Sequence, residues 1–280
     1  MTENPIITLT TDFGYRDPFV GVLRGVILSI NPRATVVDLT HGIKPHNISE
    51  AAFVIGMNYR YFPKGSIHVA VVDPGVGSKR RPIMVEADHH YFIGPDNGIF
   101  SYVFSMRHEI LSVVHITAGH YFFSSHSPTF QGRDVFAPVA AWFSKGVDFS
   151  KFGEPITDYE KISLALPTMT PEGVMQGEVI LIDGFGNAIT NITKEDIDNV
   201  LALSPEGHIK SVIKEIGAPL KQYYSEAEEG KLCALINSSG YLEFFINRSN
   251  AASEYGISPG DKVKIISATN PQALSDSSII

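Results

Sequence analysis

The stretch that decides the fold is residues 6–39, IITLTTDFGYRDPFVGVLRGVILSINPRATVVDL. Short β-branched runs stand at 6–11 and 35–39, which is typical of strands buried on both faces. Between them, residues 18–30 carry apolar side chains at spacings of three and four, as one face of a helix requires. A strand, a helix and a strand in succession predict a parallel sheet covered by helices.

The same alternation continues along the first half of the chain. Further central strands are predicted at 67–72 and 111–116, and a second helix at 48–59 with Asn47 or Ser49 as its N-cap. Residues 82–94 predict two strands around a polar turn, and residues 133–146 predict a helix ended by Gly146. We expect an α/β, sandwich-like domain with a mostly parallel central sheet.

The pattern changes after PTMTPEG at 167–173. Residues 175–192, MQGEVILIDGFGNAITNI, alternate and turn on two glycines as a hairpin does, and short strand candidates follow at 231–236, 241–246 and 261–267. This texture predicts a smaller β-barrel-like domain. We therefore expect an N-terminal domain over 1–170 and a C-terminal domain over 171–280.

Composition excludes several classes of protein. The 280 residues carry 22 Lys and Arg against 30 Asp and Glu, a net charge of −8, and no basic block suits nucleic acid or an anionic membrane surface. No apolar run approaches the roughly 20 residues needed to span a bilayer. The single cysteine, Cys233, and an N-terminus unlike a signal peptide favour the cytoplasm.

Two acidic clusters follow predicted strands. Asp12 comes after the first strand, at the sheet edge where ligands bind, and its carboxylate could accept both hydrogen bonds of a sugar diol. An Asp that shapes a turn or caps a helix is the equally ordinary interpretation. Asp73 begins DPGVGSKRR, where Asp73 with Arg80 could hold and polarise a water molecule; a tight turn followed by a surface basic pair stays open.

Two further clusters are less specific. Residues 124–141 form a polar loop that enters a helix, where Asp134 is typical of a first-turn acid and His126 of a loop. Residues 182–187, IDGFGN, place Asp183 and Asn187 beside Phe185, which suits either a plain hairpin turn or recognition of adenine by stacking and hydrogen bonds. No HExxH, Cys/His zinc spacing or GxSxG is present, so we expect no metal site and no serine nucleophile.

Six segments together resemble one family in order along the chain: TDFG (11–14), DLTHGI (38–43), VVDPGVGSKRR (71–81), GPDNG (94–98), TFQGRDVFAPVAA (129–141) and DGFGNAITNI (183–192). They resemble the S-adenosyl-L-methionine (SAM) hydroxide adenosyltransferases, also called SAM hydrolases or DUF62 and related to fluorinase and chlorinase. The resemblance implies attack of water or hydroxide on the ribose C5′ of SAM, with adenosine and methionine as products and no cofactor. It also implies a homotrimer whose sites lie between one subunit's N-domain and its neighbour's C-domain.

The resemblance also assigns residues. Asp12 would hold the ribose diol, Asp183 and Asn187 the methionine amine and the adenine edge, and Tyr241 would stack on adenine. The other substrate-binding positions that it implies are His46, Val76, Phe130, Gly132, Phe185 and Ser238.

The catalytic set departs from the family at one position. Asp73 and Arg80 match two of the residues that activate water, but Gln131 stands where the family's TFHGRD carries histidine. A glutamine amide cannot take a proton near neutral pH. Asp73 with Arg80 could suffice, His126 or His46 could substitute, or the activity could be reduced or altered.

Three functions follow from this departure. The retained Asp73 and Arg80 resemble the water-using branch, and a carboxylate would repel a halide, so we predict hydrolysis of SAM. The alternatives are a non-catalytic SAM- or adenosine-binding protein and a halide-dependent enzyme.

Overall fold

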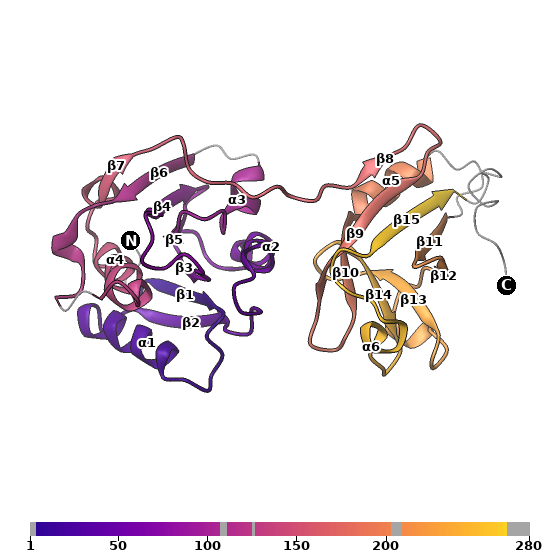
Figure 1. The fold of residues 1–280 in the computed structure, drawn as a ribbon, viewed down its shortest axis with the longest axis horizontal. Helices are drawn as coiled ribbons and strands as arrows, with labels where there is room; N and C mark the ends of the chain where they lie inside the picture. The colour runs from indigo at the N-terminus through magenta and orange to yellow at the C-terminus, as the bar shows by residue number, and fades with distance from the viewer. Residues whose placement is uncertain (1–3, 107–110, 125–126, 203–208, 268–280) are drawn as a thin grey trace. The chain divides into compact units, whose positions relative to one another are not determined.

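The computed structural model describes residues 4–106, 111–124, 127–202 and 209–267. The chain divides into two compact units, Met1–Leu164 and Ala165–Ile280, where the sequence placed the division between residues 170 and 171 (Figure 1). Within the described residues, no helix has both the length and the apolar character needed to cross a membrane.

The described residues of the first unit form a seven-stranded sheet and four α-helices. Its strands are β1 (Ile6–Thr11), β2 (Thr35–Thr40), β3 (Ile67–Val71), β4 (Pro82–Ala87), β5 (His90–Pro95), β6 (Leu111–Ile116) and β7 (Gly153–Pro155). Its α-helices are α1 (Phe19–Ile30), α2 (Ile48–Asn58), α3 (Ser101–Ser105) and α4 (Ala137–Ser144), and a π-helix, η3 (Gly132–Phe136), leads into α4. Single 3-10 turns lie at η1 (Tyr59–Tyr61), η2 (Gly119–Tyr121) and η4 (Phe149–Lys151).

The sheet begins parallel and ends antiparallel. Its strand order is β2-β1-β3-β5-β4-β6-β7. β1 pairs in parallel with β2 and β3, and β3 with β5, whereas β4, β6 and β7 pair antiparallel. The direction changes because β4 and β5 form a hairpin whose two turn residues, Asp88 and His89, both have positive φ.

Two of the strands expected at the centre of the sheet lie elsewhere. β2 is an edge strand that is only partly buried, and β6 lies second from the opposite edge. A β-branched run predicts a strand but not its neighbours, so this part of the expectation was wrong.

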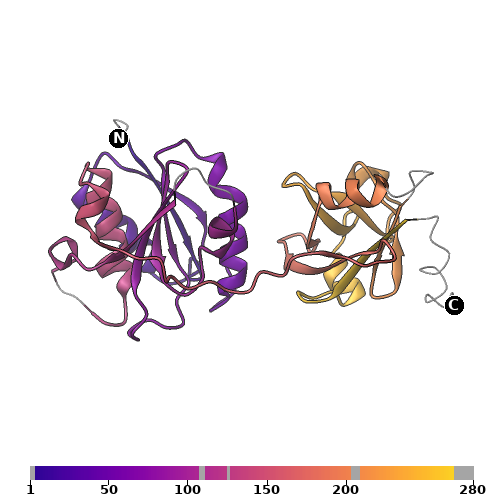
Figure 2. The same ribbon diagram turned by 90° about the horizontal axis from the view of Figure 1, so that it is seen from above.

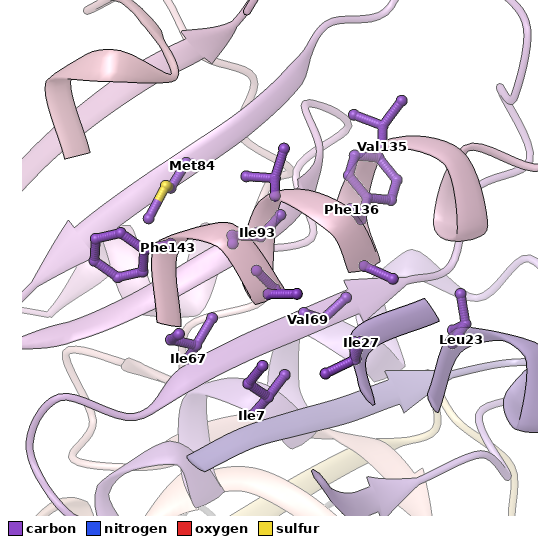
Figure 3. Close-up of a cluster of buried hydrophobic side chains, with 14 of the residues drawn as sticks. Ile7, Leu23, Ile27, Ile67, Val69, Met84, Ile93, Val135, Phe136 and Phe143 are labelled. Carbon is purple, nitrogen blue, oxygen red and sulfur yellow. The ribbon is translucent and has the colours of Figure 1, made fainter. Parts of the chain in front are cut away.

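Helices cover both faces of this sheet, as Figures 1 and 2 show. α1 and α4 pack on one face, where their apolar side chains meet those of β1, β3, β4 and β5; Figure 3 shows part of this core, including Ile7, Ile27, Val69 and Phe143. α2 and α3 pack on the other face. Asn47 caps α2 as expected, because its side chain accepts from the Glu50 N–H at 3.1 Å. The α/β sandwich is confirmed.

The second unit is an antiparallel, nearly closed sheet. Its strands are β8 (Thr168–Met169), β9 (Met175–Ile182), β10 (Ala188–Thr193), β11 (Ile209–Ile213), β12 (Ile216–Ala218), β13 (Leu232–Ile236), β14 (Tyr241–Ile246) and β15 (Lys262–Ser267). Its helices are α5 (Lys194–Ala202) and α6 (Ala251–Tyr255), with a 3-10 turn, η5 (Tyr224–Glu226).

The strands follow the order β12-β11-β15-β9-β10-β14-β13. The two edges of this sheet approach each other, because the segment after β12 hydrogen-bonds to β13. Ala234 of β13 donates to the Pro219 carbonyl at 3.0 Å and accepts from the Lys221 N–H at 2.8 Å. The barrel-like domain predicted from the sequence is confirmed, with β9 and β10 as its hairpin.

Candidate functional site

The first unit contains a cavity of about 590 Å³ at the end of β1 and β3. Parallel neighbours end at the same sheet edge, so the segments after these two strands meet there. The residues predicted from the sequence that line the cavity are Asp12, His46, Asp73, Val76, Phe130, Gln131 and Gly132.

Asp12 joins two loops at this edge. Its Oδ2 accepts from the backbone N–H of His46 at 2.9 Å, which ties the loop after β1 to the loop after β2. Asp12 does not cap α1, whose N-cap position is Pro18. His46 has a positive φ of 67°, and it lines the cavity beside Pro45.

Asp73 and Arg80 form a buried bidentate pair. Arg80 Nε donates to Asp73 Oδ1 at 2.7 Å and Nη2 to Oδ2, with the two side chains only 8% and 5% exposed. The guanidinium also lies 5.6 Å from the centre of the Phe136 ring. Arg80 is therefore not a surface cation.

Gln131 extends this pair. Arg80 Nη2 also donates to Gln131 Oε1 at 2.7 Å. Because a guanidinium has donors only, the amide oxygen must face Arg80, and the amide NH₂ is left to donate toward the cavity that Gln131 lines. The side chain can therefore orient a bound group but cannot accept a proton from it.

The loops that carry these groups approach closely. Gly77, at a φ of 81°, leaves room beside the Pro128 carbonyl oxygen, from which an added Cβ would be 3.2 Å away. This contact brings the segment after β3 against the segment that precedes η3. A glycine suits both the conformation and the close approach.

The π-helix η3 follows Gln131 directly. Asp134, buried in its first turn, accepts from the Ser127 N–H at 2.6 Å and from the Arg133 guanidinium. It thus ties down the loop in front of the helix, as expected of a first-turn acid. Extra-wide turns of this kind often occur at functional sites, where they redirect a side chain. His126 lies outside the described residues.

Three aromatic rings form one wall of the cavity. Phe130 packs edge-on against Phe13 and Phe19, with ring centres 6.0 and 5.3 Å away, and the Arg133 guanidinium lies 5.3 Å from the centre of the Phe130 ring. These contacts hold the Phe130 ring in the wall of the cavity.

The second unit contains a cavity of about 560 Å³ at the β9–β10 turn. Asp183 organises this turn: its Oδ1 accepts from the N–H groups of Phe185 and Asn187, both at 2.9 Å, and its Oδ2 from Asn187 Nδ2 at 3.2 Å. Phe185 is 81% exposed. The hairpin turn and the cavity wall are therefore the same residues.

The cavity also has walls that the sequence did not single out, Tyr224, Ile246, Arg248 and Ser249. The Tyr224 hydroxyl donates to Glu243 Oε1 at 2.8 Å, and burial raises the pKa of Glu243. Arg248 and Ser249 follow the apolar strand β14 in the polar run NRSN, a pattern that marks a loop but not a site.

Ser238 and Tyr241 lie elsewhere in this unit. Ser238 lies in the turn before β14 and Tyr241 is the first residue of β14, whereas Ile246, at the other end of β14, lines the cavity. Neither lines either of the two cavities. Across the described residues, no three His, Cys, Asp or Glu side chains are grouped to hold a metal.

Two family models cover most of the chain. The model of the SAM hydroxide adenosyltransferase N-terminal domain matches residues 7–153, and that of the C-terminal domain matches residues 177–264. The chain belongs to this family. The resemblance of the six segments is therefore confirmed, and the SAM hydroxide adenosyltransferase domains correspond to the two units.

Curated relatives carry two names. Proteins called (R)-S-adenosyl-L-methionine hydrolase include one from Methanocaldococcus jannaschii, 37% identical over 93% of this chain and 95% of the relative. Another, from Thermus thermophilus, is 33% identical over 91% and 97%. A fluorinase from Actinopolyspora mzabensis is more distant, 26% identical over 94% and 97%.

A solved structure has the same fold. It is a protein from Thermotoga maritima described as an uncharacterized conserved protein, with a TM-score of 0.84 and 31% identity over 93% of this chain and 99% of that chain.

Proposed function

We propose that this SAM hydroxide adenosyltransferase hydrolyses SAM to adenosine and L-methionine. The observation that carries the proposal is the buried Asp73–Arg80 pair, bonded to Gln131 on the wall of a cavity that also contains Asp12. The names of relatives up to 37% identical over nearly the whole chain support the same reaction.

The chemistry asks little of the protein beyond positioning. The oxygen of water forms a bond to C5′ of the ribose while the C5′–S bond breaks, and the bonding electron pair stays on sulfur, which loses its positive charge. A sulfonium leaves without protonation, so no general acid and no cofactor are required at that side. An aligned nucleophile shielded from bulk water accounts for most of the rate.

Asp73 would hold the nucleophile. Both its oxygens accept from Arg80, but each carboxylate oxygen has a second lone pair with which to accept from a water O–H. The proton released as the bond to carbon forms passes to Asp73 and then to solvent. Gln131 would donate its amide N–H to the same water and fix its orientation.

Asp12 would bind the ribose diol, with Val76, Phe130, Gly132 and His46 as walls around the sugar and the sulfonium. In the second unit, Asp183 and Asn187 would bind the methionine amine and the adenine edge, next to Phe185. Ser238 and Tyr241 stay predictions from the resemblance alone. We also propose a cytoplasmic homotrimer.

The relatives' names specify the (R) epimer at sulfur. We propose the same preference here, since a rigid site that aligns C5′ with a fixed nucleophile distinguishes the two arrangements of groups around sulfur. In a mixture of epimers, chiral chromatography should show that the (R) form is consumed and the (S) form remains. Equal consumption would contradict this preference.

Product analysis tests the reaction. With SAM, chromatography should show adenosine and methionine in equal amounts. Asp12→Ala should mainly raise KM, because each lost hydrogen bond to a charged acceptor costs about 1.5–3 kcal/mol. Methylthioadenosine as the product, or no product, would refute the proposal.

A second candidate is a protein that binds SAM or adenosine without turnover. Gln131 favours it, because the amide cannot accept the proton that a histidine there would take. Calorimetry would then show binding while chromatography shows no adenosine, and failure to bind either compound would exclude this candidate.

A further inference from the structure

His41 lies buried between the ends of β1 and β2, outside the residues that line the cavity. The residue is 1% exposed, and its side chain is fully buried. Nδ1 lies 2.8 Å from the Thr11 hydroxyl, and Nε2 lies 3.1 Å from Asp38 Oδ1, a close contact that does not meet hydrogen-bond geometry. A titratable group enclosed in this way must have its two ring nitrogens matched to these neighbours.

The neighbours determine where the ring proton lies. Arg24 first, then His41 and Tyr15, hold the pKa of Asp38 well below its usual range, so Asp38 is a carboxylate and can only accept. In the neutral imidazole, Nε2 therefore carries the proton toward Asp38, and Nδ1 accepts from the Thr11 hydroxyl. The lone pairs of Thr11 Oγ1 are left to accept from the Phe13 N–H, at 3.2 Å.

This arrangement of hydroxyl, imidazole and carboxylate is not a nucleophilic triad. The Thr11 side chain is fully buried and its oxygen already accepts a backbone hydrogen bond, so no substrate carbon can reach it. Neither Thr11 nor His41 lines the cavity. The role must be exerted through other residues.

The bonds from His41 enclose Asp12 on both sides. Thr11 precedes Asp12 and is bonded to the imidazole, while the Gly14 N–H, two residues after Asp12, donates to the His41 carbonyl at 2.8 Å. The Asp12 carboxylate in turn accepts from His46, on the segment that begins at His41.

We propose that His41 is a positioning residue that aims the Asp12 carboxylate at the ribose diol of the substrate. This inference rests on the proposed function, since it takes Asp12 as the diol-binding group. It goes beyond that function by assigning substrate recognition to a side chain outside the cavity.

The measurement is inhibition of SAM hydrolysis by adenosine and by 2′,3′-dideoxyadenosine, which lacks the diol. The ratio of the inhibition constant of 2′,3′-dideoxyadenosine to that of adenosine reports the diol contact alone. His41→Leu removes both ring contacts and should lower this ratio by about tenfold or more, as loss of a hydrogen bond to a charged group does. His41→Asn, whose amide oxygen can still accept from Thr11, should keep most of it.

A second histidine provides the matched control. His68 Nδ1 lies 2.8 Å from the hydroxyl of Thr8, also on β1, and His68 is equally buried but does not line the cavity. His68→Leu should lower stability while leaving the ratio unchanged. Thr11→Val, which keeps the side-chain shape and removes the hydroxyl, should act like His41→Leu and serves if that variant does not fold.

The outcomes separate the two claims. Folded His41→Leu or Thr11→Val with the ratio of the unaltered protein would overturn the role of His41, as would an equal loss in His68→Leu. Asp12→Ala with an unchanged ratio would instead refute the diol assignment of the proposed function, and the positioning role with it.

Discussion

Asp12 and Asp73 are carboxylates on the wall of one cavity, but the protein holds them differently. Asp73 is held by two donors of Arg80 and is 5% exposed, whereas the contact described for Asp12 is a single backbone N–H. A rigid, charge-compensated group suits orientation of a nucleophile, and a more open one suits a ligand that enters and leaves. The two residues should therefore differ in which kinetic constant they control.

Asp73→Asn should lower kcat by about 100-fold or more and change KM little, because positioned proton acceptors contribute about 10²–10⁴ to rate. Steady-state kinetics with SAM measures both constants. Asp17→Asn is the control, because Asp17 lines the same cavity but is exposed. A variant whose affinity collapses while kcat persists would identify Asp73 as a binding residue.

Gln131→His should add an ionisation to the pH profile. An imidazole must be neutral to accept a proton, so we expect a faster reaction that declines below about pH 6.5, the ordinary range of histidine. The pH dependence of kcat checks this, with Gln131→Leu as a control that gains no such limb. If Gln131→His has the same rate and the same pH profile as the unaltered protein, the position is dispensable.

At the level of residues, sequence reasoning found the groups that follow strands. Asp12 and Asp73 follow β1 and β3, whose parallel pairing brings them to one edge, and Gln131 stands directly before η3 on the wall of the same cavity. It did not find Arg248 or Tyr224, which reach their cavity from a loop and a 3-10 turn that no periodicity locates. Tyr241 stays a prediction away from both cavities.

At the level of the elements, the buried His68 of β3 contacts His90 of the neighbouring strand β5. Burial lowers the pKa of His68 to about 3, and the pKa of His90, 3.3 Å from it, is also lowered. In the unfolded chain His68 binds a proton at about pH 6.5, whereas in the folded chain it stays neutral at that pH. The contribution of neutral, buried His68 to the free energy of unfolding is therefore fully present above that pH and is lost as pH falls toward 3.

We predict that, below pH 6.5, protonation of His68 in the unfolded chain lowers the free energy of unfolding by about 1 kcal/mol per pH unit. His68→Leu should be less stable at pH 7 but have a shallower decline between pH 6.5 and 4.5, as measured by urea denaturation. An unchanged slope in the variant would show that His68 is not the group responsible.

The type of each element, helix or strand, was predicted better than the order in which the strands pair. The β-branched run TVVDL gave β2, but its place at the sheet edge depends on pairing that sequence period does not encode. α5 was missed although its start is marked: Thr193 and Asp196 bond reciprocally, with the Thr193 N–H donating to Asp196 Oδ2 at 2.8 Å. That pattern is a capping box, which could have located the helix.

At the scale of the whole molecule, the two units were predicted because their hydrophobic periods differ. Helical and strand periods alternate in the first, and strands with glycine turns fill the second. The boundary is harder to place from sequence because residues 156–167 have neither period, and the units divide within that stretch.

The assembly is a separate prediction. Sedimentation equilibrium should give a mass about three times the 30.6 kDa of one chain, as expected for a homotrimer. A mass that stays at one or two chains at assay concentration, in a preparation that turns over SAM, would contradict the trimer and leave the reaction standing.

In the proposed reaction, water attacks C5′ of SAM in a site where Gln131 stands at the position of the family's histidine. The direct measurement is mass spectrometry of products formed in ¹⁸O-labelled water, in chloride-free buffer and again with added halide. We expect one ¹⁸O in the 5′-hydroxyl of adenosine, unlabelled methionine, and no need for halide. A 5′-halo-adenosine that forms only with halide, or bound SAM without any product, would contradict the proposed reaction.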